Sequence, residues 1–158
     1  MPIVAHPQLP SLSKLKTEDL IIADEESLAK DFKQELHIGL LNLMPDAALQ
    51  ATERQFIRLL GSDESILVHV YPTTVGSSKR GEEYQDYITK NYNDISTIYA
   101  SKLDGLIISG ANPSKPDMTD EPFWTPLVEV MDWAMENTNS ILCSCLATHA
   151  LMKYYFNI

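Results

Sequence analysis

The sequence predicts an α/β fold in which a parallel β-sheet is covered by helices on both faces. Apolar runs of strand length alternate with helical patterns along the chain, and this alternation is typical of β-α-β units. Several of these apolar runs are continuous, as expected for strands that are buried on both faces. The length of 158 residues and a hydrophobic content of 44% suit one domain with a sizeable core.

The N-terminal part of the chain differs from the rest. Residues 1–35 are polar and contain three prolines, so we expect an extended arm there, with a short helix around Asp24–Gln34. The α/β domain itself is expected to occupy residues 36–158.

Four strands are predicted, and the second is expected to lie beside the first. The first is followed by Pro45 and the second by Pro72, which mark where each run stops. The predicted strands are Leu36–Leu43, Ile66–Tyr71, Leu103–Ser109 and Ser140–Cys145.

The helices are predicted from apolar spacing and from their end signals. Asp46 is expected to cap a helix that ends at Gly61, and Glu53 is expected on its solvated face. A later helical pattern is expected to break between Asn91 and Asp94. The predicted helical segments are Ala47–Leu60, Tyr84–Tyr99, a helix that opens at Pro122, and Leu146–Phe156.

The formal charge of −10 argues against binding to nucleic acid or to an anionic membrane, because both need a basic face. No apolar run is long enough to span a bilayer, and the first residues lack the pattern of a signal peptide. A cytoplasmic protein is therefore expected.

We expect no bound metal or cofactor. The four histidines, at positions 6, 37, 69 and 149, have no metal-ligand spacing. Cys143 and Cys145 are too close in sequence for an ordinary structural disulfide.

Cys145 is the strongest candidate for chemistry. A predicted strand runs into it and a predicted helix follows at once, which is the geometry of a nucleophile elbow. The start of a helix favours an anion, so Cys145 is expected to be the more acidic thiol and Cys143 the inert one. The alternative is that Cys145 is a buried structural cysteine. His149 lies one turn further and is interpreted as a packing or capping residue rather than a base.

Other polar positions are expected near this thiol, because ligands bind at the carboxyl ends of parallel strands. The backbone N–H groups of Ala111 or Asn112, with that of Leu146, could form an oxyanion hole. Asn42 could help to line the pocket from the end of the first strand. A simple turn is the alternative interpretation of the segment at 110–112.

Taken together, these residues resemble the MetA-type homoserine O-acyltransferases, often called homoserine O-succinyltransferases. That family is similar in fold to the class I glutamine amidotransferases, a flavodoxin-like α/β architecture. The resemblance covers nearly the whole chain. It rests on Asn42-Leu-Met-Pro45, Thr52-Glu53, Gln55, Arg58-Leu-Leu60, Asp104-Gly-Leu-Ile107 with Gly110-Ala111, Phe123-Trp124, Asp132-Trp133 and Cys145.

The resemblance implies transfer of an acyl group from acyl-CoA to the hydroxyl of L-homoserine, in methionine biosynthesis, through a thioester on Cys145. Acyl-CoA is then a substrate, and no cofactor is implied. The family position that helps to choose the acyl group matches Ser114, which is small and uncharged and so favours succinyl over acetyl. A homodimer is left open.

The chain also departs from the family pattern. The family's general-base histidine and its carboxylate partner match no residue here, so the chain looks like an N-terminal half. A basic residue that often follows the Met-Pro pair is replaced by Asp46. Two alternatives stay open: the same chemistry with L-serine as acceptor, feeding cysteine biosynthesis, and a non-catalytic flavodoxin-like binding module.

Overall fold

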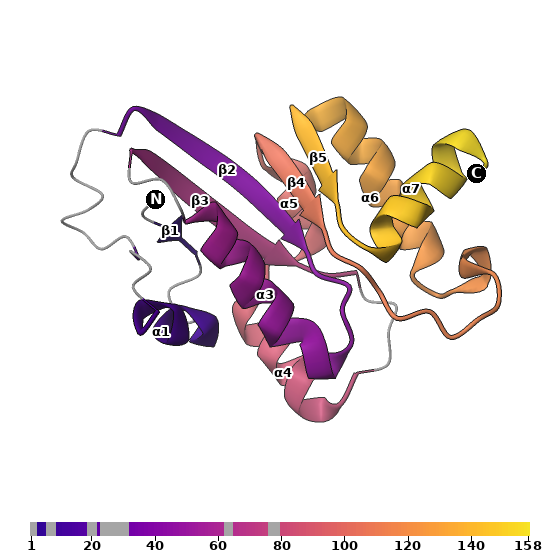
Figure 1. Ribbon diagram of the computed structural model, residues 1–158, viewed down its shortest axis with the longest axis horizontal. Helices are drawn as coiled ribbons and strands as arrows, with labels where there is room; N and C mark the ends of the chain where they lie inside the picture. The colour runs from indigo at the N-terminus through magenta and orange to yellow at the C-terminus, as the bar shows by residue number, and fades with distance from the viewer. Residues whose placement is uncertain (1–2, 6–8, 19–21, 23–31, 62–64, 76–79) are drawn as a thin grey trace.

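A computed structural model describes residues 3–5, 9–18, 22, 32–61, 65–75 and 80–158. Its strands form one sheet in the order β1-β3-β2-β4-β5, and every neighbouring pair is parallel (Figure 1). This confirms the predicted α/β class and the pairing of the first two predicted strands, and it is consistent with a flavodoxin-like fold. The strands are β1 Ile3–Val4, β2 Gln34–Leu41, β3 Ile66–Thr73, β4 Gly105–Ile108 and β5 Ser140–Cys143.

The ends of the four predicted strands differ from the observed ones by at most two residues. The β2 strand starts and stops two residues early, and β5 stops at Cys143 because the chain then turns into a helix. The β3 strand continues through Pro72 to Thr73. A proline is tolerated there because, among the described residues, β1 pairs with Val68 and His69 alone and Pro72 has a strand neighbour only in β2.

The N-terminal arm contributes to the sheet and the core. Ile3 and Val4 pair with β3, and α1 (Pro10–Lys16) buries Leu12 and Leu15. The sequence suggested an extended arm, but this part of the chain contains a strand that joins the sheet and a helix that packs on it. Of the helix expected at Asp24–Gln34, residues 24–31 lie outside the described part of the chain, and Gln34 begins β2. The boundary between arm and domain stays a prediction.

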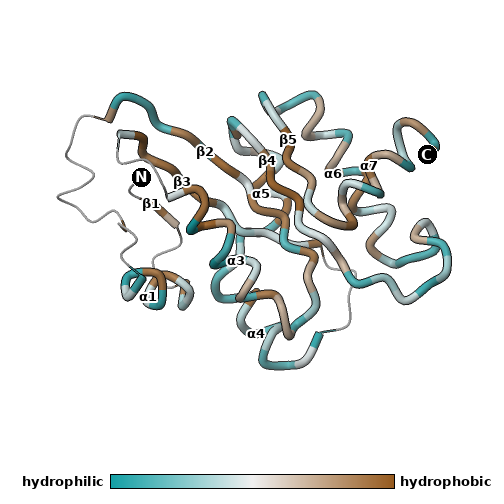
Figure 2. Tube along the Cα trace, in the orientation of Figure 1, coloured by the Kyte–Doolittle hydropathy of each residue, from teal (hydrophilic) through white to brown (hydrophobic). Residues whose placement is uncertain are grey.

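The sheet separates the core into two clusters, and helices cover the cluster on each face. Leu40, Val68 and Val70 pack with residues of α1 and α3, whereas Leu41, Leu106 and Ile108 pack with residues of α6 and α7. Figure 2 shows the strands as the most hydrophobic part of the trace. The helices are α3 Asp46–Leu60, α4 Glu82–Asn91, α5 Ile95–Ala100, the 3₁₀ turn η1 Met118–Asp120, α6 Trp124–Asn137 and α7 Leu146–Phe156.

Most of the helix predictions hold. The helix at α7 has the predicted bounds, and the expected break separates α4 from α5, where Asn93 bridges to the end of β3. The helix expected to open at Pro122 begins at Trp124 instead. Within the described part of the chain, no helix is both long and apolar enough to cross a bilayer.

Asp46 does not cap α3 as predicted. Pro45 is the N-cap residue, and Asp46 lies in the first turn. Its carboxylate instead accepts a hydrogen bond from the backbone N–H of Gly81 at 2.8 Å and pairs with the guanidinium of Arg80 at 3.1 Å. Asp46 therefore joins the start of α3 to the start of α4.

Glu53 was expected on a solvated helix face, but it is fully buried between α3 and α4. The hydroxyl of Tyr87 donates to its two carboxylate oxygens at 3.0 and 3.2 Å. Burial raises the pKa of Glu53, and hydrogen bonds from neighbouring hydroxyls, including that of Tyr87, only partly oppose this rise. The Tyr87 hydroxyl therefore supplies a hydrogen bond to the buried carboxyl group. The apolar spacing of α3 did not reveal that Glu53 is buried.

Replacing Glu53 by Gln should raise the free energy of unfolding at neutral pH. The raised pKa means that the folded state holds its proton more tightly than the unfolded state, so wild-type stability falls as pH rises through the folded pKa. Glu53→Gln removes that fall and keeps an oxygen for Tyr87. Chemical denaturation between about pH 4 and pH 8 measures the difference, which should vanish below the unfolded pKa.

Glu136→Gln is the matched control, because Glu136 is exposed on α6. Its stability difference from wild type gives the baseline for the loss of one exposed carboxylate over the same pH range. A Glu53→Gln difference that does not change with pH relative to this baseline would show that Glu53 is ionised in the folded protein without cost.

Candidate active site

Cys145 occupies a sharp turn between β5 and α7, at the carboxyl edge of the sheet. It is the N-cap residue of α7, with φ of 56° and ψ of −124°. A positive φ is strained for a residue with a side chain and costs on the order of 1–3 kcal/mol. The thiol is exposed. A strained, exposed thiol at a strand-to-helix turn is the nucleophile-elbow geometry that the sequence predicted.

The loop after β4 lies directly against this turn. A Cβ atom placed on Gly110 would be 3.0 Å from Cβ and 3.3 Å from Sγ of Cys145. It would also be 3.5 Å from the backbone nitrogen of Leu146. Glycine at this position therefore leaves room for the thiol and brings the Leu146 N–H to the same junction.

Asn42 is fully buried just after β2, and its side-chain amide makes its hydrogen bonds to other groups of the protein. Its amide nitrogen donates to the carbonyl of Leu49 at 2.9 Å and lies 3.0 Å from the hydroxyl of Tyr92. Its amide oxygen accepts from the backbone N–H of Met44 at 3.2 Å. Asn42 therefore holds the loop that follows β2, rather than offering its amide to a pocket.

Ser109 continues this polar junction towards Cys145. Its hydroxyl accepts from the backbone N–H of Leu43 at 2.8 Å. The same hydroxyl lies 3.3 Å from the amide oxygen of Asn42 and 3.0 Å from the carbonyl of Gly110. Asn42 and Ser109 together therefore set the position of Gly110, which in turn contacts Cys145.

Ala111 and Asn112, which follow Gly110 on the loop after β4, line a hollow of about 360 Å³. Its other walls come from the loop after β2, the start of α3, Arg80 and Phe123. Asn112 is exposed and Leu146 is half-buried. The backbone nitrogen of Leu146 thus lies close to Gly110, whereas Ala111 and Asn112 line the hollow. The oxyanion hole formed from their N–H groups stays a prediction.

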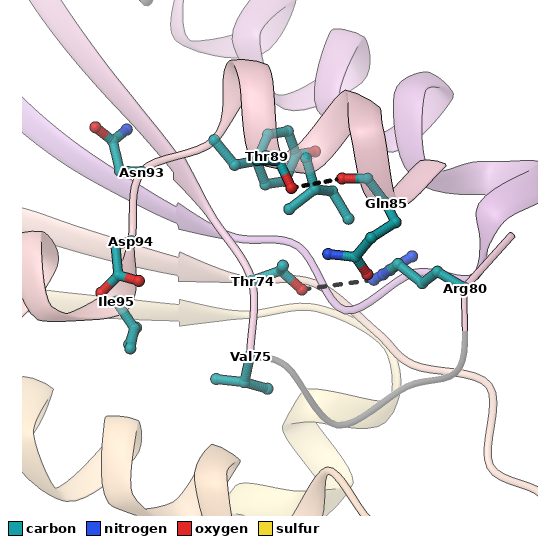
Figure 3. A pocket seen from close by; sticks show the side chains of 10 residues that line it. Thr74, Val75, Arg80, Gln85, Thr89, Asn93, Asp94 and Ile95 are labelled. Atoms are coloured by element: carbon teal, nitrogen blue, oxygen red, sulfur yellow. Dashed lines mark hydrogen bonds between the residues drawn. The ribbon is translucent and has the colours of Figure 1, made fainter. Parts of the chain in front are cut away.

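Arg80 is a residue that sequence reasoning missed. Its guanidinium is almost buried and donates to the carbonyl of Met44 and the carboxylate of Asp46, both at 3.1 Å. It also lies 3.5 Å from the hydroxyl of Thr74, at the rim of a second hollow of about 420 Å³ (Figure 3). Arg80 lines both hollows, and its contact with Asp46, 34 residues earlier in the sequence, could not be read from local spacing.

Ser114 is exposed on the loop between β4 and η1. Its backbone N–H and that of Lys115 donate to the carboxylate of Glu121, and its hydroxyl lies 3.4 Å from the same group. Burial disfavours the charge of Glu121, but these N–H donors outweigh it and lower the pKa. Glu121 therefore fixes the loop that carries Ser114, another feature that local sequence patterns do not show.

The other candidate residues near the thiol have modest surroundings. Cys143 is half-buried, and burial raises the pKa of its thiol. His149 is exposed on α7, which contradicts a packing role, and the capping role suggested as the alternative stays a prediction. The described residues thus leave Cys145 as the exposed thiol of the pair.

Comparison with known proteins identifies similar sequences along the whole chain. The family model for homoserine O-succinyltransferase matches residues 2–158. The homoserine O-succinyltransferase of Methylobacter tundripaludum is 52% identical, and the match covers 100% of this chain and 45% of the relative. Those of Methylococcus capsulatus and Allochromatium vinosum are 48% and 50% identical, with matches that cover 45% and 44% of the relatives. The chain thus spans less than half the length of these relatives.

Cys145 should react with iodoacetamide faster than Cys143 at mildly acidic pH. Cys145 is exposed at the start of α7, whereas burial raises the pKa of Cys143. Gly110→Ala should slow the labelling of Cys145, because the added methyl group would press on the thiol. Mass-spectrometric mapping of the labelled peptides over time measures both rates.

Gly81→Ala is the matched control. A Cβ atom there would be 3.5 Å from Asp46 Oδ2, an ordinary contact, so the rate at Cys145 should not change. Faster labelling of Cys143, or an unchanged Cys145 rate in Gly110→Ala, would contradict this description of the elbow.

Proposed function

The chain belongs to the homoserine O-succinyltransferase family, and we propose that this protein transfers the succinyl group of succinyl-CoA to the hydroxyl of L-homoserine. This reaction belongs to methionine biosynthesis. The observation that carries the proposal is Cys145, an exposed thiol held at positive φ at the N-cap of a helix. An acyl-transfer nucleophile needs this exposure and this fixed position.

In the first step, the thiolate of Cys145 attacks the carbonyl carbon of the succinyl thioester. The carbonyl oxygen becomes an oxyanion, for which the Leu146 N–H beside Gly110 is a candidate donor. The bond from carbon to the CoA sulfur then breaks, CoA leaves as a thiolate, and the succinyl group remains on Cys145.

In the second step, the homoserine hydroxyl attacks the same carbon. A general base takes the hydroxyl proton, the bond from carbon to Cys145 Sγ breaks, and O-succinylhomoserine leaves. The family assigns the base to a histidine that matches no residue in this chain. The exposed His149 is on α7 itself, one turn beyond the nucleophile, and is not assigned the role.

The hollow lined by Ala111 and Asn112 has a size that supports binding of a small polar substrate. Its volume of about 360 Å³ lies within the range of small-molecule sites, and it borders the loop that contacts Cys145. Its cation, Arg80, is already paired with Asp46. An anionic substrate group would therefore meet a nearly neutral pair, and neighbouring backbone N–H groups would have to contribute to its recognition.

Incubation with succinyl-CoA and no acceptor should leave one succinyl group on the Cys145 peptide, as measured by mass spectrometry. In a protein that also supplies the general base, L-homoserine should discharge it, because the deprotonated hydroxyl takes the acyl group, whereas this chain, in which no residue is assigned that role, should keep the group. Cys145→Ala should abolish labelling and lower turnover by several orders of magnitude, whereas Cys143→Ala should retain both. Discharge by L-serine rather than by L-homoserine would identify L-serine as the acceptor. If no succinyl group forms on Cys145, the protein is a binding module and not an acyltransferase.

Ser114→Glu should shift donor preference from succinyl-CoA towards acetyl-CoA. A carboxylate at this position would repel the succinyl carboxylate, and it would also lie near the buried carboxylate of Glu121. The ratio of kcat/KM for the two donors measures the effect. Ser114→Gln is the matched control, with similar size and no charge, and equal ratios in the two variants would remove charge at this position from donor choice.

A further inference from the structure

Two histidines and a glutamate meet on the β2–β3 pair, away from Cys145. His37 on β2 lies directly opposite His69 on β3 in the parallel register. Glu35 precedes His37 by two residues, so both side chains leave the same face of the strand. The start of β2 is at the other end of the sheet from α7 (Figure 1). Sequence spacing could not show this cluster, because strand register brings together residues that are 32 positions apart.

The side chains of Glu35, His37 and His69 lie close together. The two imidazole rings stack with centroids 4.5 Å apart and planes 9° from parallel. Oε1 of Glu35 is 2.5 Å from Nε2 of His69 and 3.9 Å from Nε2 of His37. One ligating atom from each of these residues lies within 4.8 Å of the others, the one such group of three found among the described residues.

A further hydrogen bond orients His37. Its Nδ1 is 2.8 Å from the hydroxyl of Tyr71, which lies on the same face of β3. When Nδ1 donates to this hydroxyl, the lone pair of His37 is on Nε2 and is directed towards Glu35. Histidines that bind metals are usually held in this way by a partner on the other ring nitrogen.

The cluster is open to solvent. The side chains of Glu35, His37 and His69 are 55%, 37% and 18% exposed. Glu35, His37 and Tyr71 also line a hollow of about 670 Å³ beside the start of β4. An ion can therefore reach the three ligand atoms, and water can complete its coordination.

We propose that Glu35, His37 and His69 bind one divalent transition-metal ion, with Zn²⁺ as the best match. Two imidazole nitrogens, one carboxylate oxygen and a water molecule make a tetrahedral set that suits this ion. Bonds of about 2.0–2.1 Å place donor atoms roughly 3.3 Å apart. His69 and Glu35 must separate slightly, and the stacked imidazole rings must tilt so that both Nε2 atoms face the ion; the exposed side chains of Glu35 and His37 leave room for these changes.

The bound ion would join β2 to β3 rather than take part in acyl transfer. From His37 to the end of β2 at Leu41, the strand runs for about 13 Å away from the cluster towards the edge that carries Cys145. The site does not depend on the proposed acyltransferase activity. Its expected effect is on stability, because an ion that binds only the folded chain raises the melting temperature.

The competing explanation is a proton in place of a metal. A protonated His69 would hold Glu35 by a charge-assisted hydrogen bond, and no ion would be needed. The two explanations differ in a direct way. A metal site binds Zn²⁺ with a stoichiometry of one and loses affinity as pH falls and the imidazoles protonate, whereas the proton-bound cluster gains no stability from Zn²⁺.

The test is titration of the purified protein with Zn²⁺, followed by calorimetry and by melting temperature. Cys143→Ser/Cys145→Ser is the background, so that thiolates cannot bind the ion. One Zn²⁺ should bind and raise the melting temperature, and Co²⁺ should give the absorption of a tetrahedral site without thiolate bands. His37→Ala and His69→Ala should each abolish this binding, and His149→Ala, which removes an exposed histidine on α7, should not.

Tyr71→Phe leaves all three ligands in place and should weaken binding by about 10–100-fold, because it removes the partner that orients His37. This variant keeps the test decisive if an alanine variant fails to fold. Binding that survives His37→Ala or His69→Ala, binding lost in His149→Ala, or no rise in melting temperature with Zn²⁺ would each overturn the proposal.

Discussion

The carboxyl edge of the sheet depends on the hydrogen bonds of the buried Asn42 side chain. An amide that is removed from water must have its hydrogen bonds satisfied, or it costs about 1–3 kcal/mol per group. Asn42 meets this condition with partners from the following loop, α3, the residue after α4, and Ser109 at the end of β4. Any shift of one of these segments would leave a buried polar atom unpaired, so the segments are held in one arrangement.

That arrangement explains how the strained backbone at Cys145 can persist. Positive φ at this position costs energy that only the surrounding structure can supply. Ser109 holds the Gly110 carbonyl, Gly110 lies against Cys145, and the Ser144 N–H donates to the carbonyl of Ile108 at 2.9 Å. The end of β4 therefore holds the residue before Cys145, and the loop that follows β4 packs against Cys145 itself.

The sequence reveals what local patterns encode and misses what the register brings together. Strands β2 to β5, α7 and the elbow at Cys145 follow from apolar runs and an abrupt strand-to-helix change, which neighbouring residues determine, whereas β1 in the N-terminal arm was not predicted. Glu53 was misplaced because its burial comes from α4, and Asp46 because its partners come from the start of that helix. The pairing of His37 with His69 depends on strand register, which no spacing within either strand contains.

Asp104 shows how the two ends of the sheet are connected. The first half of β2 has no β4 partner, because the β2–β4 ladder begins at Ile38 opposite Gly105. Asp104 closes this gap: its carboxylate accepts from the His37 N–H, and its own N–H donates to the His37 carbonyl, both at 2.8 Å. The Asp104 carbonyl accepts in turn from Asn139, just before β5. One residue thus pairs the backbone of His37, whose side chain belongs to the polar cluster, and starts the strand that ends at the loop against Cys145.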